Sequence, residues 1–245
     1  AGCGGAGDGP GAPLDARRTA RDLQAVASTL DSPPLKALLR ARPAIDAVLG
    51  SRALGTTVDL LLPIAAAAPG APSAGARAML ASSARRAPPL EVPWPMAASA
   101  VGITFELAPE GGRYVASSRR GAPATGTRFI LYAGVAADRR REVGWVDVAR
   151  EPGDDGTLTL RVQGDGTTWL DCRLSRTEEP GGGALLLAGA ASGAAGPLTF
   201  DVRVERSAAT GGLEQVTRRL HLAQRDLALS WTVTGDAAAP ARALD

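Results

Sequence analysis

The spacing of hydrophobic residues along this chain changes near Ser99. Before that residue, leucine and alanine recur at intervals of three and four, which is the spacing of one face of a helix. After it, apolar residues alternate with polar ones, as along a strand that turns one side to a core. This change of period predicts an α+β fold in which short helices precede a mostly antiparallel β-meander of about ten strands. An unclosed barrel capped by the helices is one form that such a chain can take.

Helices are predicted for residues 14–30, 35–40, 44–49 and 76–86. Ser32 followed by two prolines is typical of a helix start, and Gly50 is the expected helix end. Residues 58–68 fit either type of element, because Pro63 interrupts them. A proline-rich stretch, 88–95, then closes a helical segment that we place at residues 14–98.

The most informative strand pattern lies in residues 127–148, which read as a hairpin with a polar turn at 136–141. Phe129 and Leu131 fall on one face of the first strand, and Ile130 and Tyr132 fall on the other. Because both faces are apolar, we expect this strand to be covered on both sides and to lie inside the sheet.

The remaining strands complete a β domain at residues 99–236, followed by a loose tail at 237–245. Asp165 and Gly166 mark a tight hairpin turn, whereas residues 185–187 form only a short apolar run. Aromatic residues make up 4% of the chain, so each large one is informative. The expected structural core therefore consists of Phe129, Leu131, Tyr132, Trp145 and Trp231.

Composition and charge help to exclude one class of partner, but they do not indicate a function. The 245 residues carry 27 basic and 25 acidic side chains, for a net charge of +2. Lys36 is the only lysine, and the wealth of alanine, glycine and arginine is typical of a high-GC genome. We expect no nucleic-acid partner, because no basic stripe with interleaved aromatic residues is present.

Candidate chemistry is sparse along the whole sequence. His221 is the only histidine and reads as a solvent-facing strand residue, so no zinc cluster is expected. Cys172 lies between Leu170 and Leu174 on one strand face and reads as a small buried residue. No Gly-x-Ser-x-Gly elbow and no phosphate-binding loop occur. We therefore predict no catalytic residues, no cofactor and no metal, and a protein that is not an enzyme.

The first residues, Ala1-Gly2-Cys3, resemble the end of the lipobox of bacterial lipoproteins. The resemblance implies a diacylglycerol on the Cys3 thiol, which would anchor the chain in a membrane of the cell envelope. Gly4 after the cysteine implies the outer membrane if the source is a Gram-negative bacterium. Residues 1–13, rich in glycine and proline, would then hold the lipidation site and a flexible tether. The alternative is a fragment that begins here by chance.

Two functions from different classes fit these observations. The first is a non-catalytic structural or interaction module, presented at the envelope to a protein partner. The second is a binder or carrier of lipid or another hydrophobic ligand in a sheet concavity. Helices followed by antiparallel strands are similar in plan to the periplasmic lipoprotein carriers, in which an unclosed barrel under a helical lid holds acyl chains. That resemblance is architectural, and no motif residue carries over from it.

Overall fold

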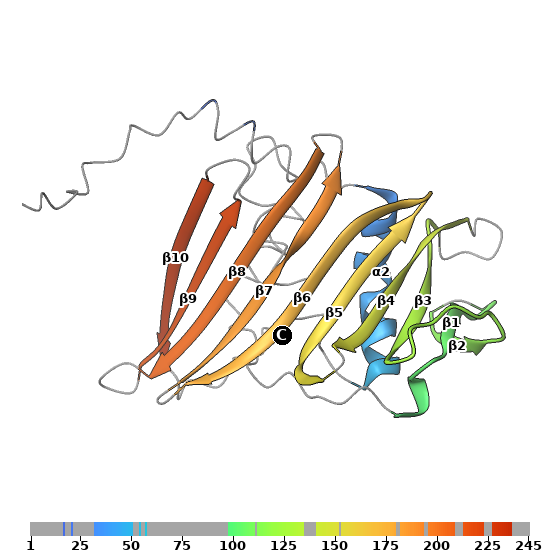
Figure 1. Ribbon diagram of the computed structural model, residues 1–245, viewed down its shortest axis with the longest axis horizontal. Helices are drawn as coiled ribbons and strands as arrows, with labels where there is room; N and C mark the ends of the chain where they lie inside the picture. The colour runs from blue at the N-terminus through green and yellow to red at the C-terminus, as the bar shows by residue number, and fades with distance from the viewer. Residues whose placement is uncertain are drawn as a thin grey trace, which may run out of the picture.

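A single large sheet with one helix across its face forms the described part of the molecule (Figure 1). The computed structural model describes residues 32–50, 98–110, 112–134, 141–151, 153–179, 182–193, 196–208, 213–222 and 227–236, together with residues 17, 21, 54 and 57. The predicted helices at 14–30 and 76–86 therefore lie outside the described residues, except that Arg17 and Arg21 are helical.

The sheet has ten strands in the order β10-β9-β8-β7-β6-β5-β4-β3-β1-β2. Their bounds are β1 Thr104–Leu107, β2 Tyr114–Ser117, β3 Gly126–Tyr132, β4 Glu142–Glu151, β5 Asp154–Gly164, β6 Thr167–Glu179, β7 Gly182–Gly193, β8 Gly196–Ala208, β9 Leu213–Leu222 and β10 Leu227–Asp236. From β3 to β10 each strand pairs antiparallel with the next, as the alternating pattern predicts. The sheet does not close, since β10 and β2 are its two edges.

The start of the sheet departs from a simple meander. β1 pairs antiparallel with β2 but parallel with β3, so β2 lies at the edge and serves as the crossover between two parallel strands. The alternating pattern predicts a strand from Val101, yet the short helix η1 (Ala98–Ala100) and a turn at Gly102 precede β1. The Gly102 amide donates to the carbonyl of Gly126, 2.7 Å away, which fastens this turn to the start of β3.

One continuous helix, α2 (Pro33–Leu49), replaces the two short helices expected at 35–40 and 44–49. Ser32 and Gly50 flank its ends as predicted, although the Ser32 hydroxyl makes no capping hydrogen bond; Gly50 lies in the left-handed region, with its amide bonded to the Asp46 carbonyl. Pro43 lies inside the helix, where a proline costs about 3 kcal/mol. Leu38 before it and Ile45 after it are both buried, so packing on the sheet offsets that cost and keeps the helix unbroken.

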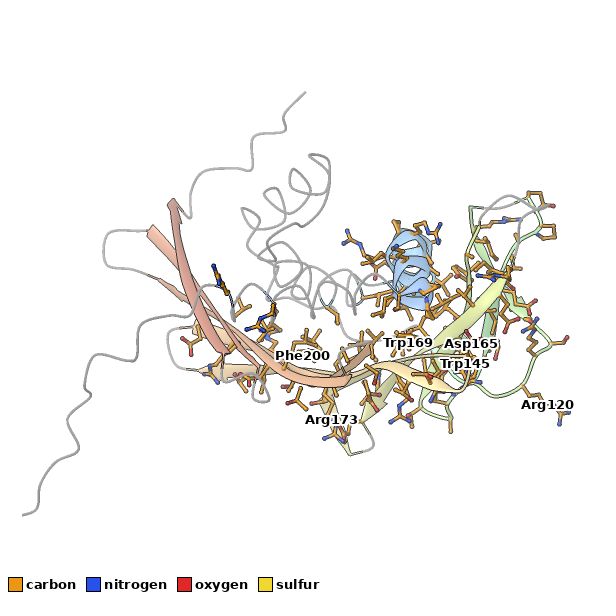
Figure 2. All side chains as sticks on the ribbon, turned by 90° about the horizontal axis from the view of Figure 1, so that it is seen from above. Arg120, Trp145, Asp165, Trp169, Arg173 and Phe200 are labelled. Carbon is orange, nitrogen blue, oxygen red and sulfur yellow. The ribbon has the colours of Figure 1, made fainter. Side chains whose placement is uncertain are left out.

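The core lies between the sheet and α2, on the concave face of the curved sheet (Figure 2). Residues in register on neighbouring strands form its rows, such as Val148, Leu160 and Cys172 on β4, β5 and β6. Helix α2 packs mainly on β2, β3, β4 and β5, while fully buried Leu54 belongs to the same core. Each buried leucine or valine contributes about 1.5–3 kcal/mol. None of the described helices is long and apolar enough to cross a lipid bilayer.

Phe129 and Leu131 are completely buried in this core, and Ile130 on the other face of β3 is only 3% exposed. The strand has neighbours on both sides, β4 and β1, so its expected place inside the sheet is confirmed. The Phe129 ring stacks on Phe105, with centroids 5.4 Å apart, and meets the edge of Tyr114 at 5.3 Å. An aromatic cluster therefore joins β1, β2 and β3.

Two other residues of the expected core need correction. Tyr132 was expected on the face of Ile130, but the register shifts between Leu131 and Tyr132, and Tyr132 packs against the core beside α2. Trp145 does not belong to the core cluster: it alternates with buried Val146 and lies half-buried on the opposite face. The backbone of Trp231 lies in β10 as expected, and its side chain is outside the described residues.

Candidate functional site

The two faces of the sheet differ in chemistry, and among the described side chains the charged ones of the sheet gather on one face. Phe200 points to the concave face, on the side of α2, whereas Arg173 points away from the convex face (Figure 2). The concave face is filled by the apolar core. The convex face is therefore the surface on which the described side chains can meet a polar ligand.

Alternating charges cross the convex face on four neighbouring strands. Arg128, Asp147, Arg161 and Asp171 follow one another in register on β3, β4, β5 and β6. Arg128 binds Asp147 through two parallel hydrogen bonds of 2.7 and 2.8 Å. Arg161 donates to Asp171 at 2.9 Å from Nε and 2.7 Å from Nη2. Two parallel hydrogen bonds to separate oxygens fix the orientation of the Arg128 guanidinium group, whereas both nitrogens of Arg161 meet the single Oδ2 atom of Asp171.

The two ion pairs of this row differ in solvent exposure. The side chains of Arg128 and Asp147 are 20% and 13% exposed, whereas those of Arg161 and Asp171 are 53% and 42% exposed. Arg128 also lies over the indole of Trp145, with 4.8 Å from Cζ to the ring centroid. The inner pair therefore stabilises the sheet, while the outer pair is open to solvent and to a partner.

A hollow of about 410 Å³ opens on the same convex face, over the middle of the sheet. Short side chains on adjacent strands leave this space, and a register shift after Arg150 sets Glu151 beside it. Arg173 Nη2 lies 3.1 Å from the Glu151 carboxylate, across one side. The hollow is lined by Glu151, Thr157, Arg173, Ser175, Leu186 and Ala188.

This hollow combines groups that bind rather than react. Thr157 and Ser175 bring hydroxyls, Arg173 and Glu151 bring opposite charges, and Leu186 adds an apolar surface. Within the described residues, no group of three histidine, cysteine, aspartate or glutamate side chains could hold a metal ion. Such a mixed lining suits a polar segment of another macromolecule that can exchange hydrogen bonds and charge pairs.

A second, much smaller space lies on the concave side, between α2 and the first strands. It measures about 80 Å³, and its walls include Ala41 and Ala44 of α2 together with Tyr114 and Tyr132. Pockets for small molecules usually measure about 300–1,000 Å³. The space is thus a gap left by alanines, too small for an acyl chain.

The remaining candidate residues do not gather at either place. Cys172 is 1% exposed on the concave face, where burial and then the charge of Asp171 raise the pKa of its thiol. Its predicted burial is confirmed. His221 pairs through its backbone with Asp201 and Ala228, and its side chain lies outside the described residues. Cys3 also lies outside them.

The convex features escaped the sequence interpretation because they need the register of five strands, β3 to β7. Single arginines and aspartates on alternating strands read as ordinary solvent-facing charges, and nothing in the sequence says which of them face each other. No family model, curated protein or solved structure matches this chain, so its functional argument depends on its own geometry.

Proposed function

We propose that this chain is a lipoprotein of the bacterial cell envelope, held by a lipid on Cys3, whose sheet acts as a non-catalytic interaction module. The observation that carries the proposal is the convex face, where fixed charge pairs surround a hollow with mixed polar and apolar walls. The partner is a polar surface of another envelope protein.

The anchor follows from the resemblance of Ala1-Gly2-Cys3 to a lipobox. Each buried methylene of an acyl chain contributes about 0.8 kcal/mol, so two or three chains hold a protein firmly on a membrane. When the protein is expressed behind a lipoprotein signal peptide, Cys3→Ser should move it from the membrane fraction to the soluble fraction. A variant that stays in the membrane fraction would contradict the anchor.

The convex face suits protein recognition because its groups are already ordered. The bidentate pair of Arg128 with Asp147 and the ion pair of Arg161 with Asp171 orient these side chains on the sheet. Less side-chain entropy is then lost when a partner binds. Arg173 keeps most of its surface in solvent, with 66% of its side chain exposed, and can meet a carboxylate of the partner.

Charge reversal at the rim of the hollow tests the proposal. Crosslinking in intact cells, followed by isolation of the tagged protein, should yield a discrete partner with the wild type. Arg173→Glu should reduce that adduct at least about fivefold, the effect of about 1 kcal/mol at an interface. Arg120→Glu is the matched control, because Arg120 is exposed in the loop before β3 and away from the hollow. Equal adducts from both variants would refute the proposed surface.

A carrier of hydrophobic ligands is the second candidate, and one observation favours it. The apolar rows of the concave face continue over β6, β7 and β8, beyond the strands on which α2 mainly packs. Leu174, Leu187 and Val202 are all at most 2% exposed there, so a ligand on these strands would have to displace the groups that cover them. Native mass spectrometry of the Cys3→Ser chain, with solvent extraction, tests for a bound lipid. A stoichiometric lipid would support the carrier and count against the interaction module.

A further inference from the structure

The two edges of the sheet differ in how they are protected. The β2 edge is only four residues long, and Arg119 follows it closely. Arg119 forms ion pairs with Glu106 and, at 2.8 Å, with Glu142. The hydrogen bond to Glu142 raises the pKa of the Arg119 guanidinium above its ordinary value. A short strand flanked by charge is a usual means of keeping other strands away.

The β10 edge is long and carries a charged residue only at its end, Asp236. Its ten residues pair with β9 from Leu227 to Asp236 without a register shift, so the strand is regular and free of bulges. Residues 227–235 include no charged residue and no proline. In Figure 1, β10 forms the outer edge of the sheet, opposite β1 and β2. One side of its backbone therefore has no strand partner among the described residues.

We propose that β10 is a dimerisation strand, which pairs antiparallel with β10 of a second copy of this chain around a two-fold axis. The axis runs perpendicular to the sheet, so the two sheets join into one and the concave face of each copy continues into that of the other. The β10 backbone groups that have no strand partner among the described residues then satisfy each other reciprocally, as in any antiparallel ladder. The proposal does not depend on the lipid anchor or on the convex hollow.

The sequence of β10 is complementary to itself. The register sets Leu229 in the same row as Leu220 and Val202, so the odd-numbered residues of β10 occupy the rows of the apolar face. A two-fold axis perpendicular to the sheet pairs odd positions with odd positions and even positions with even ones. Odd positions, which are mainly apolar, are thus paired with odd positions, and the even positions from 228 to 234 bring only uncharged residues together. The odd positions are Leu227, Leu229, Trp231 and Val233; the even ones are Ala228, Ser230, Thr232 and Thr234.

The nearest arginines lie on β9, one strand in from this edge. Arg218 and Arg219 lie on β9, opposite Trp231 and Ser230 of β10. Two copies can therefore join at β10 without bringing arginines of the two chains face to face on adjacent strands. Because an interface of one strand per copy is small, we expect a reversible dimer with a micromolar dissociation constant.

Analytical ultracentrifugation of the full Cys3→Ser chain tests the dimer. Its mass should rise from 24.9 kDa toward twice that value as concentration increases. In either central in-phase register, Thr232 faces Thr232 or Ser230 of the second copy, so Thr232→Lys places like charges together. It should weaken dimerisation at least about tenfold. Thr217→Lys is the matched control, because Thr217 is the register partner of Thr232 on β9, one strand in from the edge.

Opposite charges at position 232 should restore the dimerisation that like charges prevent. Thr232→Lys and Thr232→Glu should each be monomeric, and an equimolar mixture should recover the dimer. A wild type that stays at 24.9 kDa at every concentration would overturn the proposal. So would equal dissociation constants for Thr232→Lys and Thr217→Lys, or a mixture that stays monomeric. If a variant does not fold, hydrogen exchange on the wild type tests the dimer instead. Protection of the β10 amides should rise with protein concentration, while protection of the β2 amides should not. Unchanged protection of the β10 amides would also overturn the proposal.

Discussion

Phe129 gives the clearest way to test the architecture, because it is the centre of the aromatic cluster that joins β1, β2 and β3. Its side chain is completely buried. It stacks on Phe105 of β1 and meets Tyr114 of β2 edge to face. The Tyr114 hydroxyl in turn donates to the Ile130 carbonyl at 2.8 Å, which ties the outer hairpin to β3. Phe129→Ala would therefore leave a cavity where three strands meet.

The size of the effect follows from what the ring contributes. Burial of a phenylalanine side chain is worth about 1.5–3 kcal/mol. Each of the two aromatic contacts adds about 0.5–1.5 kcal/mol. The sum, roughly 2.5–6 kcal/mol, agrees with the 3–5 kcal/mol usually lost in phenylalanine-to-alanine substitutions in cores. Because domains are stable by only about 5–15 kcal/mol, Phe129→Ala should remove a large part of the total.

Equilibrium unfolding in urea, followed by far-ultraviolet circular dichroism, measures this loss. Val115→Ala is the control, since Val115 on the edge strand β2 is 36% exposed and should change the free energy of unfolding by no more than about 0.5 kcal/mol. A loss below about 1 kcal/mol for Phe129→Ala would refute the reasoning, because the ring would then not be enclosed by the three strands.

The remaining predictions concern the convex row, one glycine and the buried thiol. Asp147→Ala should cost about 1–3 kcal/mol by urea unfolding, because it leaves a sheltered guanidinium unpaired, whereas Asp171→Ala in the exposed pair should cost less than about 1 kcal/mol; equal losses would contradict the difference in shelter. Gly144→Ala should cost more than about 2 kcal/mol, since a Cβ at its φ of 147° would lie 2.0 Å from the Gln163 carbonyl oxygen; a near-wild-type melting temperature would show that β4 and β5 lie farther apart. Native Cys172 in the Cys3→Ser chain should resist thiol reagents that modify the unfolded chain, and rapid native labelling would contradict its burial.

Burial of Cys172 also predicts a pH dependence. Burial raises the pKa of this thiol above its ordinary value near 9.0, so the folded state keeps the proton while the unfolded state releases it. Stability should therefore fall as pH rises above about 8.5. The fall should be smaller in Cys172→Ala, and identical pH profiles for the two proteins would contradict the assignment.

The alternating pattern was sufficient for β5, β6 and β8 because each of these strands turns one side to the core. Period-two spacing reports which residues face that core, and short connections make neighbours antiparallel. The extent of β7 could not be predicted in this way. Only its centre, residues 185–187, is a leucine run, and the strand extends from Gly182 to Gly193 because glycine and alanine there pair with long strands on both sides.

Helix α2 shows where local rules give way to packing. Pro43 lacks an amide hydrogen and lies between the two helices predicted at 35–40 and 44–49, where it favours a break. The buried side chains before and after Pro43 lie on one face against the sheet, and their burial outweighs the local cost. Tertiary contacts decide between one helix and two, and they are not visible in the sequence.

The charged row on the convex face depends on register shifts, and the pairing of β5 with β6 shows how. The tight turn at Asp165 and Gly166 would by itself set Arg161 opposite Leu170. The shift between Val162 and Gln163 moves the pairing by one residue and places Arg161 opposite Asp171. A one-residue change of register decides which side chains meet, so the row could not be read from the turn alone.

The central claim, that the convex face meets a protein partner, is tested most directly by photocrosslinking in cells. A photoreactive amino acid at Leu186 would probe the wall of the hollow, and one at Leu39, on the exposed side of α2, would be the control. We predict one discrete adduct from position 186 that is absent from position 39 and is lost when Arg173→Glu is added. No adduct from position 186, or the same adduct from both positions, would contradict the claim.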